Sequence, residues 1–136
     1  MRSTIPGVAL VISGVLLGGA VLSAHHAFSS EFDANRPVKF KGTVSKMLWV
    51  NPHAWIFLDV QKPDGTTEEW MIEAGTPNTL LRRGLNKNSL PPGTEITVDG
   101  YQSKDGTHRA NGRDLTLADG KTLFLSNDPS EADAKK

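Results

Sequence analysis

The sequence contains no cysteine among its 136 residues. A disulfide framework, a thiolate metal site and a cysteine nucleophile are therefore excluded. An excess of charge of one sign is also missing, because 15 lysine and arginine residues balance 15 aspartate and glutamate residues. Nucleic-acid binding demands a basic surface, so this balance argues against a nucleic-acid partner.

The common signatures of catalysis are absent as well. The chain has no glycine-rich phosphate loop, no pair of carboxylates at a defined spacing and no order of residues typical of a Ser-His-Asp triad. Ser29 and Ser30 have no base near them in sequence, and Arg82 and Arg83 are explained by the end of a helix. The sequence therefore favours a non-enzymatic binding or accessory module over an enzyme.

The first 24 residues are typical of a secretory signal peptide. Arg2 gives a short basic start, an apolar stretch follows over residues 5–21, and Ala24 is a small residue before His25. We expect export to the periplasm, with membrane contact only through this peptide before its cleavage. An uncleaved anchor is the alternative, because the apolar run is nearly long enough to span a bilayer.

Removal of residues 1–24 leaves 112 residues with a net charge of −1. This length predicts one small domain, which we place at residues 25–125 and which includes an N-terminal arm. Residues 126–136 are polar and contain proline, so they are predicted to form a disordered tail.

The stretch Leu48 to Phe57 organises the predicted fold. Its Asn51-Pro52 step predicts a turn between two apolar segments, because proline cannot donate to a sheet and disfavours a helical residue before it. From Ala54 onwards apolar and other residues alternate, which predicts a strand with one buried aliphatic face. Its second face carries His53, Trp55 and Phe57, and this unusual composition indicates a binding surface or a second packed layer.

Six strands and one helix are predicted along the chain. The first strand covers residues 38–50, with Val44, Leu48 and Val50 on one face, and Gly42 within it suggests a bend or bulge. The others are predicted at residues 54–61, 67–74, 94–101, 108–117 and 121–125. The helix begins at an N-cap, Thr76, with Pro77 at its first position, and ends at Gly84.

Three strands, one helix and then two or three strands is the order of an OB-type barrel. The sequence therefore predicts a mainly β fold, a small OB-like barrel of five to six strands with one short helix between strands 3 and 4. An open sheet with one helix across it is the alternative. The predicted core contains Trp70, Ile72, Ile56, Leu58, Ile96, Val98 and Leu115, covered by Leu80 and Leu81.

The chain also resembles a family of small exported bacterial proteins that has no established reaction. The segments that carry the resemblance are His25-His26-Ala27-Phe28, Phe32-Asp33, Lys41-Gly42-Thr43-Val44, Trp49-Val50-Asn51-Pro52-His53-Ala54-Trp55, Leu80-Leu81-Arg82-Arg83-Gly84 and Pro92-Gly93. The Asn-Pro-His-Ala-Trp block and the double histidine are the most specific parts, and Ala27 stands where serine is more usual. The resemblance implies a periplasmic OB-like domain and no reaction.

The histidines are the best candidates for metal ligands. If the signal peptide is cut after Ala24, the free amine and imidazole of His25 can chelate one metal, with His53 or His108 as a third nitrogen. Nitrogen donors and the general affinity order favour copper(II). The predicted metal ligands are therefore His25, His26 and His53.

A second register leads to a different geometry. If the cut follows Ser23, the start Ala24-His25-His26 can bind copper or nickel in a plane through its amine, two backbone amides and the third imidazole. The alternative to both is that the histidines begin a solvated arm and that His53 is a turn residue bonded to a carbonyl.

Other residues give weaker candidates. Trp49, Trp55 and Phe57 are predicted ligand-binding residues, with a packed core under the N-terminal arm as the alternative. Glu68, Glu69 and Glu73 are interpreted as the solvated face of a strand. The partner is then a small ligand, a metal or a periplasmic protein. A copper enzyme built on the N-terminal histidine, and a small-molecule or haem-type carrier that uses Trp55 and Phe57, remain alternative functions.

Overall fold

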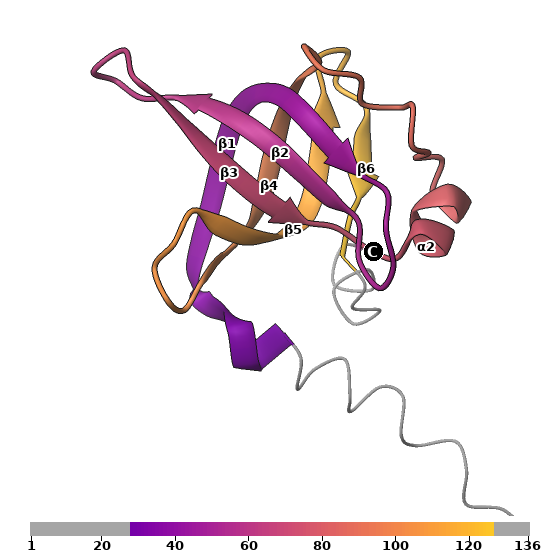
Figure 1. Ribbon diagram of the computed structural model, residues 1–136, viewed down its shortest axis with the longest axis horizontal. Helices are drawn as coiled ribbons and strands as arrows, with labels where there is room; N and C mark the ends of the chain where they lie inside the picture. Colours follow the sequence, from indigo (N-terminus) through magenta and orange to yellow (C-terminus); the bar gives the residue numbers. More distant parts are fainter. Residues whose placement is uncertain (1–27, 127–136) are drawn as a thin grey trace, which may run out of the picture.

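Six strands and two short helical segments make up residues 28–126, the part of the chain that the computed structural model describes (Figure 1). The elements are a helical turn at residues 28–31, β1 (Phe32–Leu48), β2 (Trp55–Gln61), β3 (Thr67–Glu73), α2 (Pro77–Arg82), β4 (Glu95–Ser103), β5 (Arg109–Leu117) and β6 (Thr122–Phe124). No helix in this part of the chain is long and apolar enough to cross a membrane. The predicted signal peptide, His25, His26 and residues 127–136 of the predicted tail lie outside the described residues.

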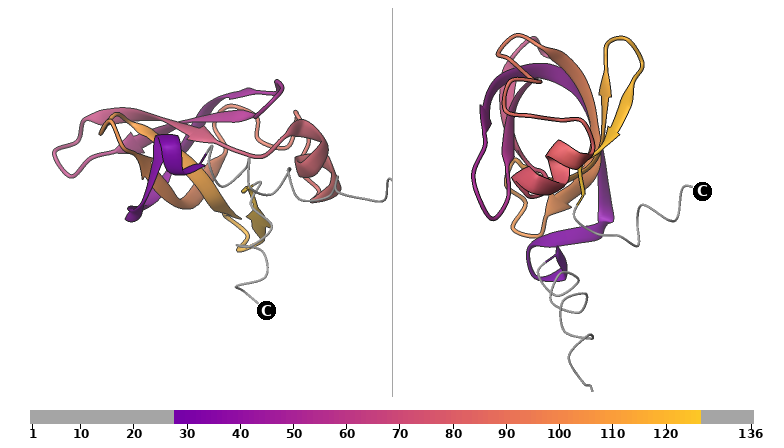
Figure 2. Two further views of the ribbon diagram at one scale, coloured as in Figure 1. Left: turned by 90° about the horizontal axis from the view of Figure 1, so that it is seen from below. Right: turned by 90° about the vertical axis from the view of Figure 1, so that its right-hand side faces the viewer.

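Five of the strands close into a ring. β1, β2 and β3 form an antiparallel meander, β1 also pairs with β4, and β4 pairs with β5. A short parallel pairing of β3 with β5 completes the circle, and β6 extends the sheet beside β5. Seen from the side of α2, the strands surround a central space and the helix lies across one opening (Figure 2). The predicted small OB-like barrel, with its helix between the third and fourth strands, is confirmed.

The helix and the turn at Asn51-Pro52 form where their local sequence signals predicted them. Thr76 is the N-cap of α2 and its hydroxyl accepts a hydrogen bond from the Thr79 amide, while Pro77 occupies the first turn. Gly84 follows the helix with a φ of +88°, a left-handed conformation that glycine adopts without a steric penalty. The chain also turns at Asn51-Pro52, where the peptide bond is cis.

The core fills the ring with the residues that the alternation predicted. Ile56 and Leu58 of β2 are fully buried, and they join the other predicted core residues Trp70, Ile72, Ile96, Val98, Leu115 and Leu80 in one cluster. The prediction for Leu81 is wrong, because 52% of this residue is exposed. A helix of only six residues presents one narrow stripe to the barrel, and Leu80 occupies it together with Leu85 beyond the helix end.

The first strand differs from its prediction in two ways. It begins at Phe32 rather than at residue 38, because Phe32 pairs with Ser103 of β4 and is itself buried. Its bulge also lies between Val44 and Lys46 rather than at Gly42, and the register with β2 shifts there by one residue. A one-residue shift exchanges the two faces of a strand. Val50 is therefore 46% exposed, and Met47 and Trp49 pack against the core instead.

Candidate functional site

The predicted site residues do not all fall in one place. His25 and His26 lie outside the described residues, three and two positions before Phe28. His53 lies in the loop between β1 and β2, and Trp55 and Phe57 project from the outer face of β2 because their neighbours Ile56 and Leu58 are buried. Trp49 does not share this outer face, because its side chain packs against the barrel core.

His53 is held by a carboxylate that the sequence interpretation placed in solvent. Its Nδ1 lies 3.0 Å from Oε1 of Glu73, and the exposed fractions of the two side chains are 32% and 11%. The Asn111 side-chain amide donates a longer hydrogen bond, 3.5 Å, to the same oxygen. The interpretation of Glu68, Glu69 and Glu73 as one solvated face is therefore wrong for Glu73.

Burial shifts the pKa of Glu73. Desolvation raises the pKa of this carboxyl, with a smaller contribution from the negative charge of Glu31, while His53 and Arg109 act in the opposite direction. The carboxyl is buried because three strands meet at this point. Glu73 is the last residue of β3, opposite Trp55 of β2 on one side and Asn111 of β5 on the other.

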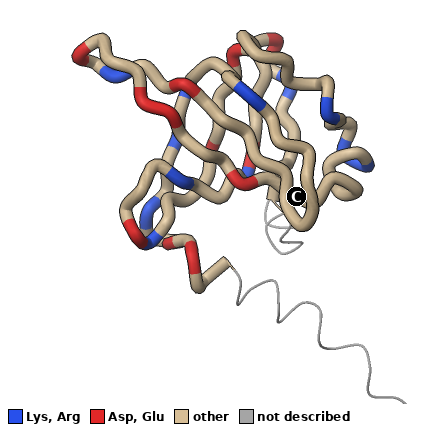
Figure 3. Tube along the Cα trace, in the orientation of Figure 1, with Lys and Arg blue, Asp and Glu red and all other residues tan. Residues whose placement is uncertain are grey.

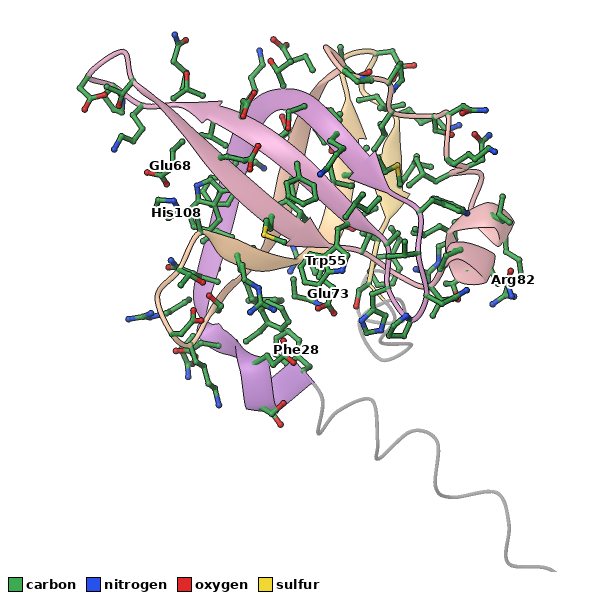
Figure 4. The ribbon with its side chains drawn as sticks, viewed as in Figure 1. Phe28, Trp55, Glu68, Glu73, Arg82 and His108 are labelled. Atoms are coloured by element: carbon green, nitrogen blue, oxygen red, sulfur yellow. The ribbon has the colours of Figure 1, made fainter. Side chains whose placement is uncertain are left out.

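The helical turn at residues 28–31, here called the N-terminal turn, is docked close to this pair. The Phe28 ring contacts Tyr101 edge-on at 5.6 Å between centroids, and the Glu31 carbonyl accepts a 2.9 Å hydrogen bond from the Lys104 amide. The Glu31 carboxylate lies 3.0 Å from Arg109 Nη2. Figure 4 shows Phe28, Trp55 and Glu73 on the same side of the barrel.

This docking places the N-terminal turn close to the pair of His53 and Glu73. The Glu31 side chain is near enough to Glu73 to influence its pKa. The N-terminal turn therefore lies on the same region of the surface as His53.

A second histidine forms a separate cluster at the other end of β3. His108 Nε2 lies 3.2 Å from Oε1 of Glu68, and the Trp70 indole donates a 2.7 Å hydrogen bond to the same oxygen. The His108 ring also stacks on Trp70 at 5.1 Å between centroids. His108 and Glu68 are labelled in Figure 4, well away from Glu73. This position does not support His108 as the third nitrogen beside His53.

Within residues 28–126 no three His, Asp or Glu side chains gather closely enough to hold a metal ion by themselves. Charges of both signs are interspersed along the chain in Figure 3. The described residues thus supply a single oriented imidazole at His53, and any further donors at this position have to come from elsewhere.

Sequence comparison gives the family. Residues 14–112 match the Family of unknown function (DUF6152), which is more than half of the chain. The chain belongs to this family. No curated protein and no solved structure matches the sequence or the fold significantly. The resemblance to an uncharacterised family is thereby confirmed, and the comparisons assign no activity to the site.

Sequence reasoning missed Glu73, Arg109 and Glu31 as members of the site. A signal for Glu73 was present, because the turn at residues 62–66 sets the register of the β2–β3 hairpin and places residue 73 opposite Trp55. Arg109 arrives through the parallel pairing of β5 with β3, a contact between distant parts of the sequence that no local pattern predicts.

Proposed function

We propose that this protein is an exported, non-enzymatic binding module that holds a transition metal, copper(II) in particular, at His53. The amine and imidazoles of the predicted mature N-terminus, His25 and His26, supply the remaining nitrogen donors. The observation that carries this proposal is the 3.0 Å contact between His53 Nδ1 and Glu73.

The contact matters because of what it does to the imidazole. Metal-binding histidines usually donate their second ring N–H to a carboxylate, which fixes the tautomer and the orientation of the ring. Glu73 engages Nδ1, so Nε2 of a neutral His53 is left as the nitrogen that can bind a metal. A histidine that merely closed a turn through a backbone carbonyl would have no need for a buried carboxylate.

The docked N-terminal turn provides the second support. The contacts of Phe28 and Glu31 with β4 and β5 dock the N-terminal turn on the surface that carries His53. In this proposal the amine and imidazole of His25 join the oriented imidazole of His53 in a nitrogen-rich set of donors. Copper(II) is preferred over other divalent first-row metals by such donors.

Calorimetric titration with copper(II) tests the proposal on protein that starts at His25. We expect one bound ion per chain, and affinity about tenfold or more weaker in His53→Ala. Glu73→Gln should weaken binding by about 10- to 100-fold, because a neutral amide oxygen is a weaker acceptor for Nδ1–H than a carboxylate and leaves the imidazole a less basic ligand. His108→Ala is the matched control and should bind copper as the parent does, because its imidazole faces Glu68.

A second comparison tests the N-terminus. Protein with an additional N-terminal methionine keeps every described contact but removes the free amine from His25. We expect copper affinity to fall in this form while the thermal unfolding temperature stays the same. Equal affinities in the parent, the extended form and His53→Ala would show that the histidines begin a solvated arm and that the proposal is wrong.

A further inference from the structure

The outer face of the barrel beside His53 carries a row of side chains that crosses four strands. Lys46 of β1 is opposite Phe57 of β2, Phe57 is opposite Met71 of β3, and Met71 is opposite Arg109 of β5. Trp55 lies next to Phe57 on the same face, two residues along β2. We call the set Lys46, Trp55, Phe57, Met71 and Arg109 the aromatic face.

A cation lies near each of the two aromatic rings of the aromatic face. Lys46 Nζ lies 4.4 Å from the centroid of Phe57, and the Arg109 guanidinium lies 5.5 Å from the centroid of Trp55. The aromatic rings and Met71 are half-buried, whereas Lys46 is exposed. A flat apolar centre is thus bounded by two positive groups, of which the exposed Lys46 has a flexible stem that can move aside at little cost.

Arg109 already binds a carboxylate at this face. The Glu31 carboxylate lies 3.0 Å from Arg109 Nη2, and 55% of the Glu31 side chain is exposed. The same guanidinium lies 5.5 Å from the centroid of Trp55 and 5.9 Å from that of Phe32. The N-terminal turn therefore presents a tethered carboxylate to a guanidinium that lies close to two aromatic rings.

The acidic groups of the face restrict how a ligand can lie. Asp59 and Glu69 are paired with each other in the next row along β2 and β3, beyond Phe57 and Met71, and the largely buried Glu73 lies opposite Trp55. An anion placed there would be repelled, whereas an anion beside Arg109 is attracted. A ligand with one negative group and one flat apolar part fits this distribution in a single orientation.

We propose that the aromatic face binds a planar aromatic molecule that carries a carboxylate. The ring system lies over Trp55, Phe57 and Met71, and the carboxylate takes the place of Glu31 on Arg109. This site needs neither His53 nor the residues before Phe28, so its occupation does not require the proposed metal, although Arg109 and Glu31 also act on the neighbouring Glu73 carboxyl. Glu31 acts in it as an internal competitor.

Three small probes separate the ring from the charge. 1-Naphthoate has both, 1-naphthalenemethanol has the ring without the charge, and cyclohexanecarboxylate has the charge without the aromatic ring. In calorimetric titration we expect measurable binding of naphthoate and affinities about tenfold weaker for the other two. Equal binding of naphthoate and naphthalenemethanol would overturn the role of Arg109.

Variants then locate the site. Arg109→Gln and Trp55→Ala should each weaken naphthoate binding by about tenfold, and their unfolding temperatures report whether the barrel remains folded. Glu31→Gln should strengthen binding several-fold, because the internal competitor loses its charge. The matched control is Glu95→Gln, which neutralises an exposed carboxylate 2.9 Å from Lys41 on another part of the barrel and should change nothing.

The direction of the Glu31 effect decides the proposal. A residue with a purely structural role in docking the N-terminal turn would weaken or leave unchanged the binding of a ligand when it is replaced. Unchanged or weaker naphthoate binding in Glu31→Gln, or failure of the parent protein to bind naphthoate, would overturn the proposal.

Discussion

At the scale of single residues, Glu73 shows how burial changes the pKa of a carboxyl group. Its carboxyl is almost enclosed where β2, β3 and β5 meet, and desolvation raises its pKa. A raised pKa in the folded state means that the fold favours the protonated form. The stabilising contribution of that form is complete below the pKa of the unfolded chain and is lost as pH rises through the folded pKa.

Glu73→Gln is therefore expected to raise the free energy of unfolding at pH 7, because glutamine imitates the protonated carboxyl and its amide oxygen can still accept from His53. The difference from the parent should shrink as the pH falls towards the ordinary value of a glutamate, where the parent is protonated too. Urea unfolding at pH 7 and pH 4 measures it. A variant that is less stable than the parent at pH 7 but equally stable at pH 4 would mean that the charge on Glu73 supports the fold.

At the scale of elements, α2 offers two adjacent leucines in opposite environments. Leu80 is completely buried and Leu81 is 52% exposed. Leu80→Ala should lower the free energy of unfolding by about 2–5 kcal/mol, since it removes buried methyl groups and leaves a cavity. Leu81→Ala is the control and should change it by less than about 0.5 kcal/mol. Similar losses in urea unfolding of the two variants would indicate that α2 packs differently from the arrangement described here.

The loop between β4 and β5 is another element with a measurable pH response. Asp105 accepts hydrogen bonds from the Ser103 hydroxyl and from the amide and hydroxyl of Thr107, and they lower the pKa of its carboxyl to about 2. A lowered pKa means that the stabilising contribution is present above the ordinary value, 3.8, and is lost as pH falls through about 2. Asp105→Asn should therefore be less stable than the parent at pH 5, and the two should converge near pH 2. Thermal unfolding across this range measures the convergence, and a constant gap would contradict it.

Local chemistry explains which elements could be predicted from the sequence. The cap at Thr76, the proline after it and the left-handed Gly84 act within one turn of α2, so the helix was predicted correctly. The alternation along β2 likewise required only neighbouring residues. A bend or bulge in β1 was predicted at Gly42, but its position between Val44 and Lys46 was not, because it depends on how one strand pairs with β2 at one end and β4 at the other. The exposure of Val50, which follows from the position of the bulge, was therefore not predicted either.

At the scale of the whole molecule, the ring depends on contacts between distant parts of the chain. The parallel pairing of β3 with β5 spans only three residue pairs, yet it brings Arg109 and Asn111 to the surface that holds Glu73. The order of the elements predicted a barrel, but nothing local in the sequence shows which side chains the closure assembles. For this reason Trp55, Phe57 and His53 could be selected as candidates from the sequence, whereas the charged groups around them could not.

Two glycines make this closure possible and give a graded prediction. A Cβ at Gly100 would overlap the backbone carbonyl of Asn111, at the point where β5 turns from β4 towards β3. A Cβ at Gly112 would lie 2.8 Å from a methyl group of Ile72 and 2.9 Å from one of Leu125. Side chains yield more easily than backbone, so Gly112→Ala should cost about 1–3 kcal/mol and Gly100→Ala more.

Urea unfolding gives the two costs, and amide hydrogen exchange shows where the barrel opens. Faster exchange is expected first for the amides that join β3 to β5, including the Met71 amide, which donates to the His108 carbonyl. Amides that join β1 to β4 should keep their protection at the same denaturant concentration. The reverse order of the two costs would contradict the difference expected between side-chain and backbone contacts. Uniform loss of protection over all strands would mean that the ring unfolds as a unit and that its parallel closure is no weaker than the antiparallel pairings around it.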